Sequence, residues 1–540
     1  MPLLAQFQSW GGANGITTSL VPRTAEGMGV GLFVDMAIDQ NHQDTDFGDL
    51  LFVPYSLILS RSSILHQPCS DLATTIGTIG EDAITERLAL VLFLLYERLI
   101  LNHASTPTKF APYIAVLPEI STPVTLDPEL AQGYLAGTIL LDSVCAKRKK
   151  LEAEYAQLSG NLGAFEHWPV KPTVADFIWA DAAVWSRVLS FQSQVKESEN
   201  ELELGDDLHM VPYLDFANHA NQSNIRWQVD EQGLRVWGNE HLTLTEDAKE
   251  PEVFLSYGEK PNTELLFLYG FTLKDNPTKF LTFSMPMDEE DPYYMPKVHT
   301  LMRQGIPPRI TLYVERSGTM TDLVELCSGL WITRESLYLL WIYSLNEEDG
   351  LSALIEEPEV KVCVPHENLA EDNEEPEEVD LEDEEDIGRL IMTIQGHQIL
   401  SNEQLEAIVP KLEIYPVLML RALVMVTTRV EHYVERIMET GDKVQMTEDV
   451  ETVRAVNYES VDGVEPVKPS PTLSQPEENQ EELLKLGPHV ACLVLMMKNY
   501  RVEEMKTLVR IGNLLGEGQT KALEENEFIQ EYLAKMQVQE

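Results

Sequence analysis

The chain has 540 residues, more than one hydrophobic core normally holds, so two or more domains are expected. Hydrophobic residues make up 44% and charged residues 24% of the sequence, as is usual for globular proteins. The sequence has 39 Lys and Arg residues and 89 Asp and Glu residues, which gives a net charge of −50. So acidic a surface repels phosphate backbones, which argues against direct nucleic-acid binding; it either attracts basic proteins or only maintains solubility.

The cysteines and the apolar runs exclude further classes of protein. No Cys-x-x-Cys pair occurs, which argues against a structural zinc site or a disulfide framework and favours a reducing compartment. Charge interrupts apolar runs such as residues 88–101 before they reach the ~20 residues that span a bilayer, and the N-terminus has no basic leader. We therefore expect no membrane segment and a place in the cytosol, the nucleus or both.

The predicted elements follow one another in three blocks. Residues 16–60 contain short β-rich runs, residues 81–200 keep apolar residues at helical spacings, and strands return over 208–257. From about residue 290 the pattern is helical. The sequence therefore predicts an α+β protein: a β-rich domain at 1–285 with a helical insertion at about 75–205, then an all-helical domain at 290–540. An acidic loop at 366–387 and a Pro-rich loop at 442–482 interrupt the second domain.

Two local features suggest ligand contacts. GMGVGLF at 27–33 places Gly29 and Gly31 where a backbone can approach a ligand, although on its own a plain tight turn explains the pattern better. The apolar helix WADAAVWSRVLSF at 179–191 carries Ser186 and Arg187. An Arg on an apolar helix face needs an anionic partner, either an Asp of the core or the carboxylate of a ligand.

Two further features contain polar and aromatic groups at strand ends. VPYLDFANHANQSN at 211–224 places Asp215, Asn218 and His219 after an apolar strand, without the His or Cys partners that a metal site needs. In VFLSYGEKPNTELLFLYGF at 253–271, Tyr257 ends a strand and Tyr269 ends the following helix. Each feature alone is better explained by structure than by function.

Together and in this order, the four features resemble a SET-domain methyltransferase of the Rubisco large-subunit lysine methyltransferase type. PYLDFANH is similar to the family's P-x-x-D-x-x-N-H motif, and LSYGEKPNTELLFLYGF to its strand-Tyr, turn, Asn-x-Glu-Leu and Tyr-Gly-Phe segment. IWADAAVWSRVLSF resembles the Trp-Ala…Ser-Arg helix, and GVGLFV the early Gly-x-Gly strand. The resemblance covers most of residues 1–285; beyond 290 only the helical character and the position resemble the family's C-terminal substrate-binding domain.

The resemblance implies S-adenosylmethionine as the methyl donor and a protein side-chain nitrogen as the acceptor. It assigns the catalytic positions to Tyr257 and Tyr269, on either side of a methyl-transfer channel. The donor-binding positions that it implies are Met28, Gly29, Val30, Gly31, Ser186, Arg187, Asp215, Asn218, His219, Tyr257, Tyr269, Gly270 and Phe271. EGMGVGLFV has an extra Gly-x relative to the family's Glu-Gly-x-Gly, so either Glu26 or Met28 takes the glutamate position.

One position bears on the acceptor. Histidine-modifying relatives carry an Asn two residues after the Arg, where it can bond an imidazole, whereas this chain has Leu189 there, which favours an apolar, lysine-accepting channel. The expected function is protein-lysine N-methylation by a monomer, on a basic non-histone protein such as a ribosomal protein. The alternatives are a non-catalytic SET module that serves as an acidic adaptor and a protein-histidine methyltransferase.

Overall fold

The computed structural model describes residues 3–25, 29–35, 49–66, 69–101, 108–192, 194–198, 201–204, 207–242, 251–314, 323–356, 389–441 and 488–539. Met28 and the expected acidic and Pro-rich loops lie outside these residues. The chain divides into two compact units: residues 1–278 with 440–502, and residues 279–439 with 503–540. The sequence placed the first boundary near 290 and assigned residues 440–502 to the second domain, whereas in the structure the described residues of that span, 440–441 and 488–502, belong to the first unit.

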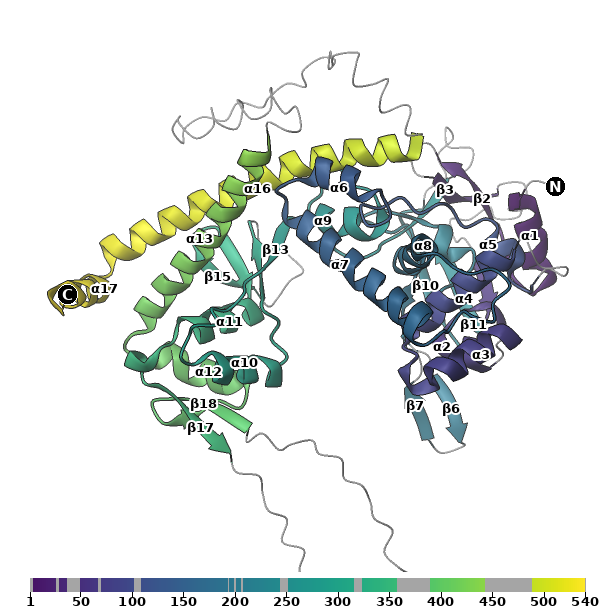
Figure 1. Cartoon of the computed structure of the whole chain (residues 1–540). Helices are drawn as coiled ribbons and strands as arrows, with labels where there is room; N and C mark the ends of the chain where they lie inside the picture. Colours follow the sequence, from purple (N-terminus) through teal and green to yellow (C-terminus); the bar gives the residue numbers. More distant parts are fainter. Residues whose placement is uncertain are drawn as a thin grey trace, which may run out of the picture. The chain divides into compact units, whose positions relative to one another are not determined.

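The first unit is built on two four-stranded sheets (Figure 1). One has the order β1 (Thr17–Thr18), β4 (Asp49–Pro54), β11 (Gly233–Gly238), β10 (Ile225–Val229), and the other the order β2 (Leu20–Ala25), β3 (Gly29–Val34), β12 (Glu252–Leu255), β9 (Asn218–His219). Leu51 and Val53 of β4 and Leu32 and Val34 of β3 are buried, whereas Phe52 and Phe33 between them are only partly buried, because successive side chains of a strand point to opposite faces. Two-stranded pairs join β5 (Leu189–Ser190) to β8 (Leu208–His209), and β6 (Gln194–Ser198) to β7 (Glu201–Leu204).

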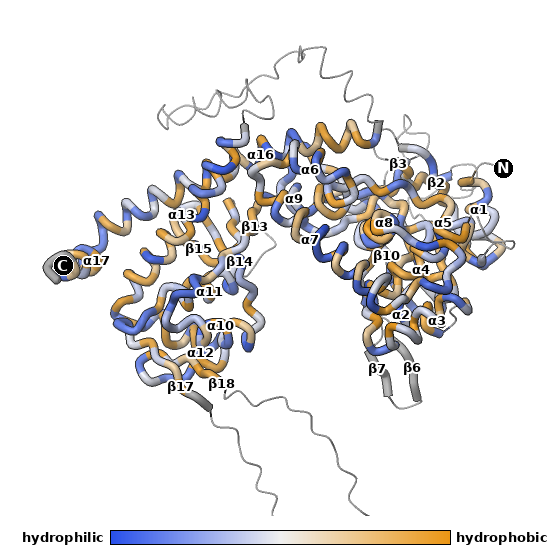
Figure 2. Tube along the Cα trace, viewed as in Figure 1, coloured by the Kyte–Doolittle hydropathy of each residue, from blue (hydrophilic) through white to orange (hydrophobic). Residues whose placement is uncertain are grey.

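Most helices of the first unit lie between β4 and β5, as predicted for the insertion. They are α1 (Leu3–Ala13), α2 (Arg61–His66), α3 (Ser70–Ile79), α4 (Glu86–Ile100), α5 (Ala111–Ile114), α6 (Pro128–Leu135), α7 (Ile139–Ala156), α8 (Val174–Trp185) and α9 (Asn262–Glu264). The apolar helices α4 and α8 pack together within the core, where Figure 2 colours them as hydrophobic.

Capping and buried ion pairs fix the position of α8. Thr173 and Asp176 form a capping box at its start, so two backbone N–H groups that the helix cannot satisfy find partners. Asp181 is buried in the middle of α8, and its carboxylate accepts from Arg87 Nε at 2.5 Å and from Lys147 Nζ at 2.8 Å. The C-terminal end of this helix, which leads into Ser186 and Arg187, is therefore held from α4 and α7.

The second unit contains strands as well as helices. One sheet has the order β13 (Phe280–Ser284), β14 (Arg309–Tyr313), β16 (Leu330–Thr333), β15 (Leu323–Cys327), and another the order β17 (Leu351–Glu356), β18 (Arg389–Ile394), β19 (His397–Gln398). Its helices are α10 (Tyr294–Arg303), α11 (Arg334–Ser344), α12 (Asn402–Ile408), α17 (Glu527–Gln539) and most of α13 (Tyr415–Gly441) and α16 (Pro488–Glu525). The α+β class is confirmed, but the prediction of an all-helical second domain is wrong. Strands of four to six residues with β-branched and aromatic side chains were overlooked beside the long helical runs.

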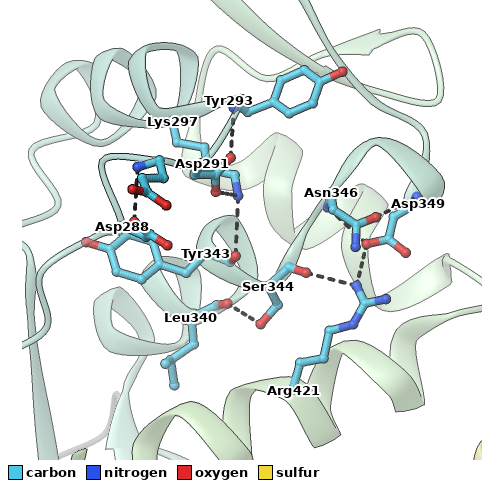
Figure 3. Close-up of polar contacts among 11 residues, drawn as sticks. Asp288, Asp291, Tyr293, Lys297, Leu340, Tyr343, Ser344, Asn346, Asp349 and Arg421 are labelled. Atoms are coloured by element: carbon cyan, nitrogen blue, oxygen red, sulfur yellow. Dashed lines mark hydrogen bonds and ion pairs between the residues drawn. The ribbon is translucent and has the colours of Figure 1, made fainter.

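Two ion pairs inside the second unit each have one buried member, Lys297 and Asp349 (Figure 3). Lys297 is 1% exposed, and its ammonium donates to Asp291 at 2.6 Å and to the Tyr343 carbonyl at 3.3 Å. Arg421 donates to the Asp349 carboxylate at 2.5 Å and to the Ser344 carbonyl at 2.9 Å. These contacts tie α13 and the segment before α10 to the C-terminal end of α11 and the turn that follows it. Across the described parts of both units, no helix is long and apolar enough to cross a membrane.

Candidate active site

The sheet β2–β3–β12–β9 brings three of the sequence motifs side by side. β12 pairs in parallel with β9, which places Phe254 opposite Asn218 and Leu255 opposite His219. Two residues beyond Leu255, the backbone N–H of Tyr257 donates to His219 Nδ1 at 3.1 Å. Burial lowers the pKa of His219, so the ring is neutral near pH 7 and its Nδ1 can accept this bond. The Asn-His motif therefore fixes the backbone that carries Tyr257.

The Gly-x-Gly motif lies on β3, which pairs with β12 on the side opposite β9. A Cβ on Gly31 would lie 2.8 Å from Asn218 Nδ2 and 2.3 Å from Glu252 Oε1, so a larger residue there would displace both side chains. Asn218 Nδ2 donates to Glu252 Oε1 at 2.6 Å. Gly29 has φ +81°, and no atom lies within 4 Å of the position that a Cβ would take there. Val30 is half-buried. Glu252 was missed, because an acidic residue at the start of an apolar strand carries no distinctive sequence signal.

An aromatic cluster surrounds Tyr257. Its ring stacks on Tyr269 with centroids 4.8 Å apart, and Phe271 lies 6.5 Å from Tyr257 and 6.1 Å from Tyr269. The Tyr257 hydroxyl donates to the Ala217 carbonyl at 2.8 Å. Burial raises the pKa of Tyr257 to about 12 and that of Tyr269 further, so both phenols stay protonated at neutral pH.

Gly270 permits the turn between Tyr269 and Phe271. It ends the π-helical turn Leu265–Tyr269 with φ +76°, and a Cβ there would lie 1.9 Å from the Ser121 carbonyl oxygen. Both the backbone conformation and the space therefore require glycine.

Arg187 and Asp215 form a buried pair beside the aromatic cluster. Arg187 Nη1 donates to the Asp215 carbonyl at 2.8 Å and lies 3.5 Å from its Oδ2, which also accepts from the Tyr113 hydroxyl at 2.6 Å. Burial raises the pKa of Asp215 to about 6, although Arg187 and Tyr113 oppose the shift. Arg187 Nε and Asp215 Oδ1 are buried and have no hydrogen-bond partner among the described residues.

The backbone just before Asp215 is strained. Tyr213 has φ +76° and ψ −58°, a γ-turn conformation that is rare for a residue with a side chain. Its ring stacks on Phe7 with centroids 4.5 Å apart, and a Cβ on Gly11 would lie 2.9 Å from Tyr213 Cε2. The aromatic packing holds a conformation that directs the following residues toward Arg187.

A cavity of about 260 Å³ lies between these groups. Six of the predicted site residues line it: Ser186, Arg187, Leu189, Asp215, Tyr257 and Tyr269. His219 and Phe271 are outside the lining but contact the Tyr257 ring. Asn218 and Gly270 are also outside the lining, and Gly29–Gly31 lie on the other side of β12. The remaining lining residues are Val188, Ser190, Leu214, Ala217, Trp227, Leu255, Ser256 and Gly258.

Two of the residues that shape the site were not predicted. The indole ring of Trp227 on β10 lines the cavity. The hydroxyl of Tyr113 on α5 donates to the Asp215 carboxylate, although the two residues are 102 positions apart in the chain. Neither lies in a motif, and their positions depend on how the insertion packs against the sheets. Among the described residues no group of three or more His, Cys, Asp or Glu side chains is arranged to hold a metal ion.

Comparison with known proteins finds similar sequences among SET-domain proteins and protein methyltransferases. The chain is 30% identical over 279 residues to SET domain-containing protein 8 of Schizosaccharomyces pombe, a match that covers 50% of this chain and 59% of that protein. It is 28% identical over 246 residues to N-lysine methyltransferase setd6 of Xenopus laevis, covering 42% and 49%. It is 25% identical over 266 residues to actin-histidine N-methyltransferase of Homo sapiens, covering 48% and 41%. The matches thus span about half the length of these relatives, and no family model matches the chain.

Solved structures give the same fold over nearly the whole chain. The structure of Rubisco LSMT bound to AdoMet matches with a TM-score of 0.57 at 16% identity, covering 99% of this chain and 96% of that one. The SET domain of LSMT bound to MeLysine and AdoHcy matches with a TM-score of 0.59 at the same identity and coverage. The resemblance predicted from the motifs is therefore confirmed: the chain is similar in sequence to SET-domain proteins that include a lysine methyltransferase, and it has the fold of Rubisco LSMT.

Proposed function

We propose that the protein is an S-adenosylmethionine-dependent protein-lysine N-methyltransferase that acts on a basic, non-histone protein. The observation that carries the proposal is the stacked pair Tyr257 and Tyr269 on the wall of a cavity whose lining also includes Arg187 and Asp215, two residues with the buried, unpartnered atoms Nε and Oδ1. The relative N-lysine methyltransferase setd6 and the Rubisco LSMT structures support it.

The residues present fit this donor. Arg187 Nε is a buried donor without a partner, so a ligand carboxylate can take a charge-assisted hydrogen bond there, with Ser186 beside it. Asn218, His219 and the Gly31 strand lie on the sheet that supports the aromatic wall. When bound, S-adenosylmethionine supplies a methyl group already activated by its sulfonium charge.

The cavity residues suit an amine acceptor. A lysine of pKa ~10.4 must lose its proton, which costs roughly 4 kcal/mol near neutral pH. Leu189, Leu255 and Trp227 line the cavity with apolar surface that excludes water, and desolvation lowers the pKa of an amine. The stacked phenol rings hold the acceptor in a narrow space, and positioning of two reactants can lower a barrier by ~7–11 kcal/mol.

The second unit is proposed to bind the protein substrate. This assignment rests on the match over 99% of the chain to the Rubisco LSMT chain and on the net charge of −50, which favours a basic partner. The competing adaptor hypothesis predicts partner binding without catalysis. It is tested by Tyr257→Phe, which cripples methyl transfer under our proposal and leaves partner binding unchanged.

Histidine is the second candidate acceptor, because the chain is also similar to actin-histidine N-methyltransferases. Leu189 is 8% exposed and lines the cavity, so an imidazole finds no side-chain amide at that position. Under our proposal, Leu189→Asn lowers transfer to lysine without creating histidine methylation. Histidine methylation by the wild-type protein, detected by mass spectrometry of labelled products, would contradict the lysine assignment.

Donor binding is tested by titration calorimetry with S-adenosylmethionine. We expect saturable binding by the wild-type protein and an affinity at least about tenfold lower for Arg187→Met, which removes the charge-assisted bond. Arg235→Met is the matched control, because Arg235 pairs with Asp49 and Asp230 near the surface and touches no cavity residue. No binding by the wild-type protein would reject the methyltransferase proposal.

A further inference from the structure

A second cavity in the first unit contains a buried carboxyl that the proposed mechanism does not use. The cavity has a volume of about 410 Å³, within the size range of small-molecule sites. It shares none of its described lining residues with the active-site cavity. The lining comes from α2, α3, α4 and the segment between β4 and α2, and ends at Thr108–Phe110 just before α5.

Most of the lining is apolar. Ile58, Leu59, Ile64 and Leu72 are each less than 5% exposed, so the wall that they form belongs to the rigid core. Two aromatic rings, Phe93 and Phe110, complete the wall and contact each other edge to face with centroids 5.5 Å apart. A ligand of this cavity must therefore have an apolar body.

Glu97 is the polar group that gives the cavity its specificity. It is 6% exposed and lies one helical turn beyond Phe93 on α4, so the two side chains share a face of the helix. The Thr108 hydroxyl donates to Glu97 Oε2, and no described residue donates to Oε1. Burial raises the pKa of Glu97 to about 7, as expected for a carboxyl that lacks a cationic partner.

Lys109, the cationic residue among the described lining residues, already interacts with other groups. Lys109 is exposed, and its ammonium donates to the Ser56 carbonyl at 2.7 Å and lies 5.3 Å from the centre of the Phe110 ring. It thus lies at the rim and leaves Glu97 without a partner of opposite charge among the described residues. A buried carboxylate is stable only when it is paired and hydrogen-bonded.

We propose that this cavity binds a small primary amine with an apolar body, whose ammonium group donates to Glu97. The inference goes beyond the proposed methyl transfer and does not depend on it. The site would recognise the amine by one charge-assisted hydrogen bond and by burial of an alkyl or aryl group against Ile64, Leu72 and Phe93.

Cys69 provides a local reporter for the test. It is an exposed free thiol in the cavity lining, whereas Cys145 on α7 is exposed and outside the cavity. Alkylation of the full chain by N-ethylmaleimide is followed at both thiols by peptide mass spectrometry, with increasing 2-phenylethylamine or its neutral counterpart 2-phenylethanol. Because the readout is local and needs no methyl transfer, its failure and that of the proposed function are distinguishable.

We expect 2-phenylethylamine to slow the alkylation of Cys69 but not that of Cys145, at a concentration about tenfold lower than 2-phenylethanol requires. Glu97→Gln should bring the two protection curves together, and Glu129→Gln, which changes an exposed carboxylate on α6, should not. Leu72→Phe, which narrows the cavity but keeps Glu97, should weaken protection by both ligands.

Three results would overturn the proposal. They are the absence of protection by either compound, equal protection by amine and alcohol in the wild-type protein, and an amine preference that survives Glu97→Gln.

Discussion

In the second unit, the buried ammonium of Lys297 and the guanidinium of Arg421 meet carboxylates and backbone carbonyls, and neither side chain leaves a buried polar atom unpaired. In the first unit, the side chains of Arg187 and Asp215 are 11% and 0% exposed, yet Arg187 Nε and Asp215 Oδ1 have no partner among the described residues. An unsatisfied buried group costs about 1–3 kcal/mol. The paired charges hold a fold together, whereas the unpaired ones leave bonding capacity for a ligand.

The largest effect is expected at the aromatic wall of the cavity. Tyr257→Phe removes the cavity hydroxyl that donates to the Ala217 carbonyl and, under the proposed function, lies beside the transferred methyl group, so kcat should fall by about 10²–10³-fold, as when one preorganised donor is removed from an active site. The donor's Kd should change little, because the phenol ring remains. Methyl transfer to a lysate protein is the measurement, with Tyr293→Phe in the second unit as the matched control. Unchanged turnover in Tyr257→Phe would remove this residue from the mechanism.

Removal of the buried Lys297 charge from the second unit should lower stability and leave catalysis unchanged. Lys297→Met leaves Asp291 without its ammonium partner, and breaking such a pair costs about 3 kcal/mol of unfolding free energy. Urea denaturation measures this loss, and calorimetry on the folded protein should give a donor affinity equal to that of the wild type. If Lys297→Met lowers donor affinity as much as Arg187→Met does, the distinction between the two kinds of buried charge is wrong.

A smaller effect is expected from the titration of Asp215. Its pKa is raised to about 6 in the folded protein, so the folded state binds more protons than the unfolded chain below that pH. This contribution to stability is fully present below the unfolded pKa and is lost as pH rises through about 6. Asp215→Asn abolishes the titration, so its unfolding free energy relative to wild type should increase by about 1.4 kcal/mol between pH 5 and pH 7.5. Urea denaturation at both pH values measures this change, and a constant difference would contradict the burial of an ionisable carboxyl there.

The motif residues of the site could be predicted because each motif is short and lies at the end of a strand or helix. Asn218, His219 and Tyr257 needed only the pairing of β9 with β12 to come together. Tyr113 and Trp227 could not be predicted, because they reach the site through packing between distant segments. The sheets of the second unit were missed for a related reason: strands as short as β16 have no period that distinguishes them from a buried helical turn.

The most direct test of the account is incubation of the purified protein with isotope-labelled S-adenosylmethionine and a host lysate depleted of it, alongside Tyr257→Phe. We predict a labelled protein band that requires Tyr257 and maps by mass spectrometry to a lysine of a basic protein. A band that is equally strong with Tyr257→Phe, or the absence of donor binding by the wild-type protein, would contradict the central claim.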